Sequence, residues 1–194
     1  SLGNYYTLRD LLKKGYDPLT IRYLLLSTNY RTPLNFTEEG LEQAQNTLNR
    51  IIDFGDRLKH LRNFHNPNPE IHKKVEEIRR RFQEAMDDNL NTPIALAAIF
   101  DFIRDVNRAI DEGKVSDGDL EEAYGLIMEF DKVLGILRME EMELEPDLKR
   151  LMELREDARR RKDWASADKI RADLLERGII LEDTPQGVRW KSKR

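Results

Sequence analysis

Residues 91–110 read NTPIALAAIFDFIRDVNRAI, and this stretch decides the class of fold. Asn91-Thr92 followed by Pro93 is typical of a helix start, because proline is tolerated in the first helical turn. Nearly every residue from Ile94 to Phe102 is apolar, so a helix over 93–110 is apolar almost all round. Such a helix is stable only where other elements cover it. The stretch therefore predicts the central helix of a bundle.

Three further helices are expected around it. Thr37-Glu38-Glu39 indicates a helix start, and a single apolar stripe follows as far as about residue 66, made by Leu41, Ala44, Leu48, Ile51, Ile52, Leu58 and Leu61. A second helix over 70–88 is expected to pack against the first as an antiparallel hairpin. A fourth is expected over 119–137, after a loop at 113–118. The fold class is thus mainly α, an antiparallel helical bundle.

Both ends of the chain differ from this pattern. Residues 1–36 alternate short helices, over 8–14 and from Pro18, with an extended connector over 30–36. At the other end, helices are expected over 147–162 and 164–177, with Gly178 as a stop. Apolar runs at 179–182 and 188–190 flank a turn-like DTPQG and predict a two-stranded hairpin. We therefore predict three parts: segment 1–36, a helical bundle over 37–140, and a small α+β domain over 141–194.

Composition excludes several classes of function. The chain of 194 residues has no cysteine and only three histidines, which excludes disulfides, thiolate nucleophiles and cysteine-rich zinc sites and favours an intracellular, cytoplasmic location. No run of about 18 apolar residues and no signal pattern are present, so no membrane is expected. No phosphate-binding glycine loop or poised acid/base pair is found. The adjacent Asp87 and Asp88 are interpreted as the end of a helix running into a turn.

Charge is distributed unevenly along the chain. Residues 149–194 hold 14 Lys/Arg against 9 Asp/Glu, a net charge of +5. Since the whole chain has a net charge of −4, residues 1–148 carry −9. The last quarter is therefore where a polyanion would be attracted. Arg159-Arg160-Arg161-Lys162 lies just before Trp164, and Asp168 follows Trp164 by one helical turn. Arginine neutralises phosphate, tryptophan stacks on unpaired bases, and a carboxylate accepts from a base edge.

A structural role for the tryptophans remains open at this point. Trp164, Ala167, Ile170 and Leu174 form a helical stripe, so Trp164 is equally compatible with a core position. Trp190 lies beside Val188 in the expected hairpin, where a tryptophan commonly covers a small core.

Several stretches resemble the cysteinyl-tRNA synthetases, a family of class I aminoacyl-tRNA synthetases. Ser1-Leu2-Gly3-Asn4 is similar to the end of the Lys-Met-Ser-Lys-Ser signature loop and the residues directly after it, with Ser1 as the last serine of that loop. Further similar stretches come in the family's order along the whole chain: YRTPLNF at 30–36, DDNLNTP at 87–93, VLG at 133–135, KDW at 162–164, and LEDTPQG at 181–187 with Trp190.

The resemblance implies a stem-contact segment over 1–36, a bundle of the class I anticodon-binding type, and an anticodon-reading C-terminal domain. It implies that Arg159, Trp164, Asp168 and Asp183 meet the anticodon loop of tRNA(Cys). The family's ATP-binding fold, zinc-held cysteine pocket and signature lysines would all precede Ser1. We therefore expect a fragment that is not itself an enzyme and holds no cofactor, while ATP and zinc belong to the catalytic domain. A monomer is the family expectation.

Two other hypotheses compete with tRNA recognition. Ligases related to this family join cysteine to small molecules and need no anticodon domain, but the intact KDW and LEDTPQG stretches argue against that reading. Alternatively, the bundle is a helical adaptor that binds proteins through its acidic faces. Salt dependence separates tRNA recognition from protein binding by an adaptor, because binding to a nucleic acid weakens steeply as the salt concentration rises.

Overall fold

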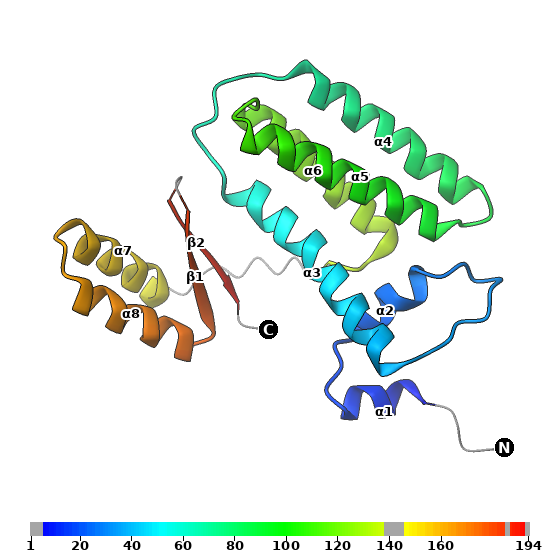
Figure 1. Cartoon of the computed structure of the whole chain (residues 1–194), viewed down its shortest axis with the longest axis horizontal. Coiled ribbons are helices and arrows are strands. Elements are labelled where there is room, and N and C mark those ends of the chain that lie inside the picture. Colours follow the sequence, from blue (N-terminus) through cyan, green and yellow to red (C-terminus); the bar gives the residue numbers. More distant parts are fainter. Residues whose placement is uncertain (1–5, 138–145, 185–186, 193–194) are drawn as a thin grey trace. The chain divides into compact units, whose positions relative to one another are not determined.

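The computed structural model of the chain describes residues 6–137, 146–184 and 187–192. Of Pro146, Lys149 and residues 182–184 and 187–192 it describes the backbone alone. These residues form eight helices and two strands (Figure 1). The chain divides into two compact units, Ser1–Arg138 and Met139–Arg194. Segment 1–36 therefore belongs to the same unit as the bundle.

Two short helices open the first unit. Helix α1 (Leu8–Lys13) begins at a capping box, in which Thr7 and Asp10 each accept a hydrogen bond from the other's backbone N–H. Helix α2 (Pro18–Leu26) begins after Asp17, whose carboxylate accepts from the Leu19 N–H at 2.8 Å. Both helices lie where the sequence predicts them.

Four long helices make the bundle: α3 (Glu38–His60), α4 (Pro69–Asp87), α5 (Thr92–Asp111) and α6 (Asp117–Leu134). Their bounds agree with the predicted helices to within a few residues, apart from the end of α3, and Thr37 caps α3 as expected. The predicted apolar stripe of α3 is buried along its length. Asp87 is the last residue of α4 and Asp88 its C-cap, so this pair of carboxylates ends a helix, as interpreted from the sequence.

The predicted hairpin of α3 with α4 is wrong. Helix α4 packs chiefly against α5 and α6, whereas α3 packs chiefly against α2 and α6 (Figure 1). The reason lies in the connection over residues 61–68, which runs across the turn between α5 and α6. There the Asp117 carboxylate accepts from the backbone N–H groups of Asn63 at 3.2 Å and Phe64 at 2.9 Å. The Asn66 and Asn68 side chains donate to carbonyls of the same turn, each at 2.9 Å.

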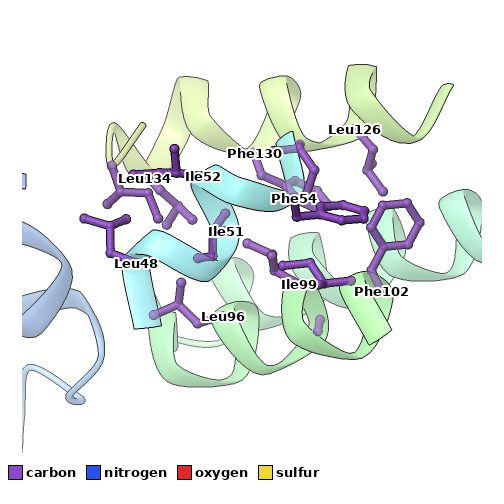
Figure 2. Packing of buried hydrophobic residues seen from close by; sticks show 14 of the residues in the cluster. Leu48, Ile51, Ile52, Phe54, Leu96, Ile99, Phe102, Leu126, Phe130 and Leu134 are labelled. Carbon is purple, nitrogen blue, oxygen red and sulfur yellow. The ribbon is translucent and has the colours of Figure 1, made fainter. Parts of the chain in front are cut away.

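The core of the first unit lies among α3, α5 and α6, with α4 closing one side (Figure 2). Phe102 of α5 is 0% exposed and meets Phe54 of α3 edge to face, with ring centroids 6.2 Å apart. Phe82 and Phe130 stack at 4.1 Å and join α4 to α6. Helix α5 is central as predicted, although Ile94 in its first turn is 52% exposed. Truncating such a core phenylalanine typically costs about 3–5 kcal/mol.

The second unit consists of α7 (Pro146–Arg160), α8 (Trp164–Glu176) and the strands β1 (Ile179–Thr184) and β2 (Gly187–Ser192). The strands pair antiparallel, with Leu181 opposite Trp190. Leu174, Ile179 and Leu181 are buried, and half-buried residues of α7 and α8 pack on them. This separate small core holds the two helices against β1.

None of the helices in the described residues is long and apolar enough to cross a membrane.

Candidate nucleic-acid interface

The basic run of the sequence forms the turn between α7 and α8. The N–H of Lys162 donates to the Arg159 carbonyl at 2.9 Å, and the N–H of Asp163 donates to the Ala158 carbonyl at 2.9 Å. This pair of bonds is the Schellman arrangement that closes a helix C-terminus. Lys162 occupies its left-handed position, with φ of 62°. The turn therefore has a defined backbone, which fixes where its basic residues leave the chain.

The four basic residues of this turn differ in their surroundings. Arg159 is half-buried and engaged in contacts. Arg160 is exposed and forms an ion pair with Asp157 one turn earlier. Arg161 and Lys162 are both exposed. The structure thus places more exposed positive charge at residues 160–162 than at Arg159, the one residue of this run that the resemblance selects.

Helix α8 begins directly after this turn. Asp163 is its N-cap and accepts from the Ser166 N–H at 3.1 Å. Hydrogen bonds from the Ser166 side chain and backbone hold the pKa of the Asp163 carboxyl below its ordinary value. This carboxylate therefore has a structural use, since it satisfies an N–H at the start of the helix. Trp164, the first residue of α8, comes directly after it.

Trp164 is 58% exposed, which decides between the two readings of its stripe. Ala167 and Leu174 are buried and Ile170 is half-buried, so the core face of α8 passes through these three residues. Trp164 does not belong to that core. Asp168 is also exposed, and four residues along a helix put it about 5–6 Å from Trp164, measured between Cβ atoms. An aromatic face and a carboxylate thus lie side by side on the surface.

Three other predicted positions lie beyond the described side chains. Ser1 is outside the described residues, and only the backbone of Asp183 and Trp190 is described. The assignments of Asp183 as an anticodon contact and of Trp190 as a core residue stay predictions.

Metal-binding groups do not converge in the described parts of the chain, where no three His, Cys, Asp or Glu residues are placed to hold an ion. His72 lies 2.6 Å from the Glu122 carboxylate on the outside of the bundle, and His60 contacts the Asp56 carbonyl at 2.7 Å.

Two of the family-like stretches that are far apart in sequence meet in the first unit. Arg31 donates to the Asn89 side chain at 3.3 Å, and the Thr92 hydroxyl donates to the Leu26 carbonyl at 2.6 Å. The connector after α2 therefore lies against the turn between α4 and α5. No periodic pattern or charge pairing in the sequence indicates this contact.

Comparison with known proteins gives three family matches in order along the chain. Residues 1–46 match the tRNA synthetases class I (C) catalytic domain, residues 81–138 the DALR domain, and residues 141–190 the cysteinyl-tRNA ligase anticodon binding domain. The last match contains the turn and the helix that carry Trp164 and Asp168. The matches therefore place the chain in the class I aminoacyl-tRNA synthetases, with a DALR domain followed by an anticodon binding domain.

Curated relatives narrow the class. The whole chain is 41% identical to a cysteine--tRNA ligase of Protochlamydia amoebophila and 40% identical to one of Solibacter usitatus. A third, from Chlamydia muridarum, is 39% identical over 98% of the chain. The chain belongs to the cysteinyl-tRNA synthetase family. It spans 41–42% of the length of these relatives.

Proposed function

We propose that this chain recognises tRNA(Cys) for cysteine--tRNA ligation, and that the exposed face of α8 reads the anticodon. The observation that carries the proposal is the exposure of Trp164 beside Asp168, at the end of a basic turn, in the unit that matches an anticodon binding domain. The ligation joins cysteine to its tRNA with ATP through an adenylate, and this chain contributes recognition to it.

Each residue has a role that its chemistry supports. The Trp164 ring offers a face on which an unpaired base can stack, worth roughly 1–3 kcal/mol. The Asp168 carboxylate can accept hydrogen bonds from a base edge that presents donors, such as the Watson–Crick edge of guanine. Arg159 is proposed to neutralise the RNA backbone, and Asp183 on β1 to make a further contact. Holding the anticodon in register helps to place the distant acceptor end for reaction, which is a positioning role.

Catalysis is proposed to lie in other parts of the ligase. We expect that this chain binds neither ATP, cysteine nor zinc. We also expect the protein to be a monomer that acts in the cytoplasm. An assay of cysteine-dependent ATP–pyrophosphate exchange tests the point directly, and detectable exchange by the purified chain would contradict it.

The recognition proposal is tested by titrating the whole chain with tRNA(Cys) and with a non-cognate tRNA at about 50 and 200 mM salt. Trp164→Ala and Asp168→Ala are compared with Lys59→Ala, which removes an exposed side chain of the first unit. We expect salt-sensitive binding that prefers tRNA(Cys), and a loss of about 1–3 kcal/mol in the Trp164 variant. Asp168→Ala is expected to weaken binding to tRNA(Cys) more than binding to the non-cognate tRNA, so the preference for tRNA(Cys) falls.

Two results would contradict the proposal. One is the absence of tRNA binding by the wild-type chain at the lower salt concentration. The other is unchanged affinity in both α8 variants, which would move recognition away from this face.

A further inference from the structure

Lys162 occupies a backbone position that suits glycine. Its φ of 62° lies in the left-handed region, where a Cβ atom crowds the following carbonyl oxygen. The Schellman arrangement requires this conformation at the residue after the C-cap, and glycine is the residue usually found there. A lysine at this position therefore carries a conformational cost that glycine avoids.

Two other helix ends of the same chain show the usual solution. After α1, the N–H of Gly15 donates to the Leu12 carbonyl at 3.0 Å and that of Tyr16 to the Leu11 carbonyl at 3.2 Å. After α5, Gly113 and Lys114 repeat the same pair of bonds, at 3.0 and 2.9 Å. Gly15 and Gly113 have φ of 87° and 65°. The same motif thus takes glycine after α1 and α5 and lysine after α7.

The side chain of Lys162 has no visible structural use that offsets this cost. It is exposed, and its ammonium group makes no hydrogen bond or ion pair within the described residues. By contrast, Arg160 is engaged by Asp157. Residues that break a local rule without a structural gain are found preferentially at functional sites. Lys162 also lies two residues before the exposed Trp164, in a chain segment that is strongly basic.

We propose that Lys162 contacts a phosphate of the RNA strand whose base stacks on Trp164. The contact is an electrostatic one and carries no base preference. This inference rests on the proposed function, because it names a backbone contact within the same tRNA surface. The left-handed turn directs the chain from Lys162 through the Asp163 cap into Trp164, so one short segment supplies both the phosphate contact and the stacking face.

The test measures how tRNA affinity changes with salt in the wild-type chain and in three variants. Lys162→Gln removes the charge, Lys162→Gly removes both the charge and the backbone strain, and Lys162→Arg keeps the charge. The matched control is Lys169→Gln, which makes the same charge change at an exposed position of α8 that lies about 140° around the helix from Trp164.

We expect each phosphate contact to contribute about 0.7–0.9 to the slope of log affinity against log salt. Between about 50 and 200 mM salt, the wild-type chain should therefore lose about threefold more affinity than Lys162→Gln or Lys162→Gly. The loss should be equal for cognate and non-cognate tRNA. Lys162→Arg and Lys169→Gln should keep the wild-type slope, and Lys162→Gly should unfold at the same or a higher urea concentration.

The inference is overturned if the Lys162→Gln and Lys162→Gly chains keep the wild-type slope, or if Lys169→Gln lowers the slope equally. The Trp164→Ala variant separates this failure from that of the proposed function. If Trp164→Ala weakens binding while the Lys162 variants do not, anticodon recognition stands and only the phosphate contact is rejected. If the wild-type chain binds no tRNA, both fail.

Discussion

Replacing Gly135 with alanine is expected to destabilise the first unit, although glycine-to-alanine changes in helices usually stabilise. Gly135 caps the end of α6 in the left-handed conformation, with φ of 59°. An added Cβ would lie 3.3 Å from Nη2 of Arg22 and 3.4 Å from its Nε. That Nε donates to the Leu134 carbonyl at 2.6 Å, so Arg22 ties α2 to the end of α6. The substitution affects both the backbone and this link.

The magnitude is set by these two effects. Left-handed strain at a residue with a Cβ costs about 1–2 kcal/mol. The lower entropy of alanine in the unfolded chain offsets about 0.4–1 kcal/mol of this. Loss of a hydrogen bond made by a charged group costs about 1.5–3 kcal/mol. We therefore expect a loss of about 1 kcal/mol if Arg22 shifts and keeps its bond, and up to about 4.6 kcal/mol if it does not.

Gly125 provides the matched control within the same helix. It lies in the interior of α6, is exposed, and has nothing within 4 Å of a Cβ built on it. Gly125→Ala is therefore expected to stabilise by about 0.5–1 kcal/mol. Urea unfolding followed by far-ultraviolet circular dichroism measures both variants. If Gly135→Ala and Gly125→Ala change the free energy of unfolding in the same direction, the reasoning about the α6 cap and Arg22 is refuted.

Three further predictions concern the two units separately. Leu174→Ala removes a side chain that is 0% exposed and should lower the free energy of unfolding by about 2–5 kcal/mol. Trp164→Ala should change it by less than about 1 kcal/mol. Circular dichroism melting compares the two variants, and equal losses would show that Trp164 is packed in the core. Hydrogen bonds from the backbone of Phe64 and Asn63 lower the pKa of Asp117 from 3.8, so its stabilising contribution is present above that pH and lost as the pH falls through the lowered pKa. The stability gap between the wild-type chain and Asp117→Asn should therefore close on acidification, and a gap that widens would contradict this sign. A chelator such as EDTA should leave the unfolding midpoint unchanged, and a lowered midpoint would reveal a structural metal.

The helices were predictable because their signals are local. Thr37 before two glutamates begins α3 through a bond made within one turn. The apolar stripe of α3 and the all-round apolar character of α5 depend only on spacing along the chain. The family resemblance added the order of the parts and the prediction that Trp164 and Asp168 contact RNA. Residue type alone supports that prediction, since a tryptophan can stack on a base and a carboxylate can accept hydrogen bonds from one.

Packing decided what local signals left open. The order of helices in the bundle depends on the connection over 61–68, whose backbone and asparagine groups find partners on the turn between α5 and α6, far away in sequence. The sequence pattern of α8 allowed Trp164 in either environment, and the small core of Leu174, Ile179 and Leu181 left it outside.

By itself, then, the sequence determined the helical class, most of the element bounds and the basic character of the last quarter, because these depend on neighbours within a few residues. Tertiary structure alone decided which helices pair, how Arg31 meets Asn89, and that Trp164 is exposed. It also revealed that Lys162 takes a left-handed turn. Each of these depends on groups that only folding brings together, or on the conformation that a closed helix end imposes on one residue.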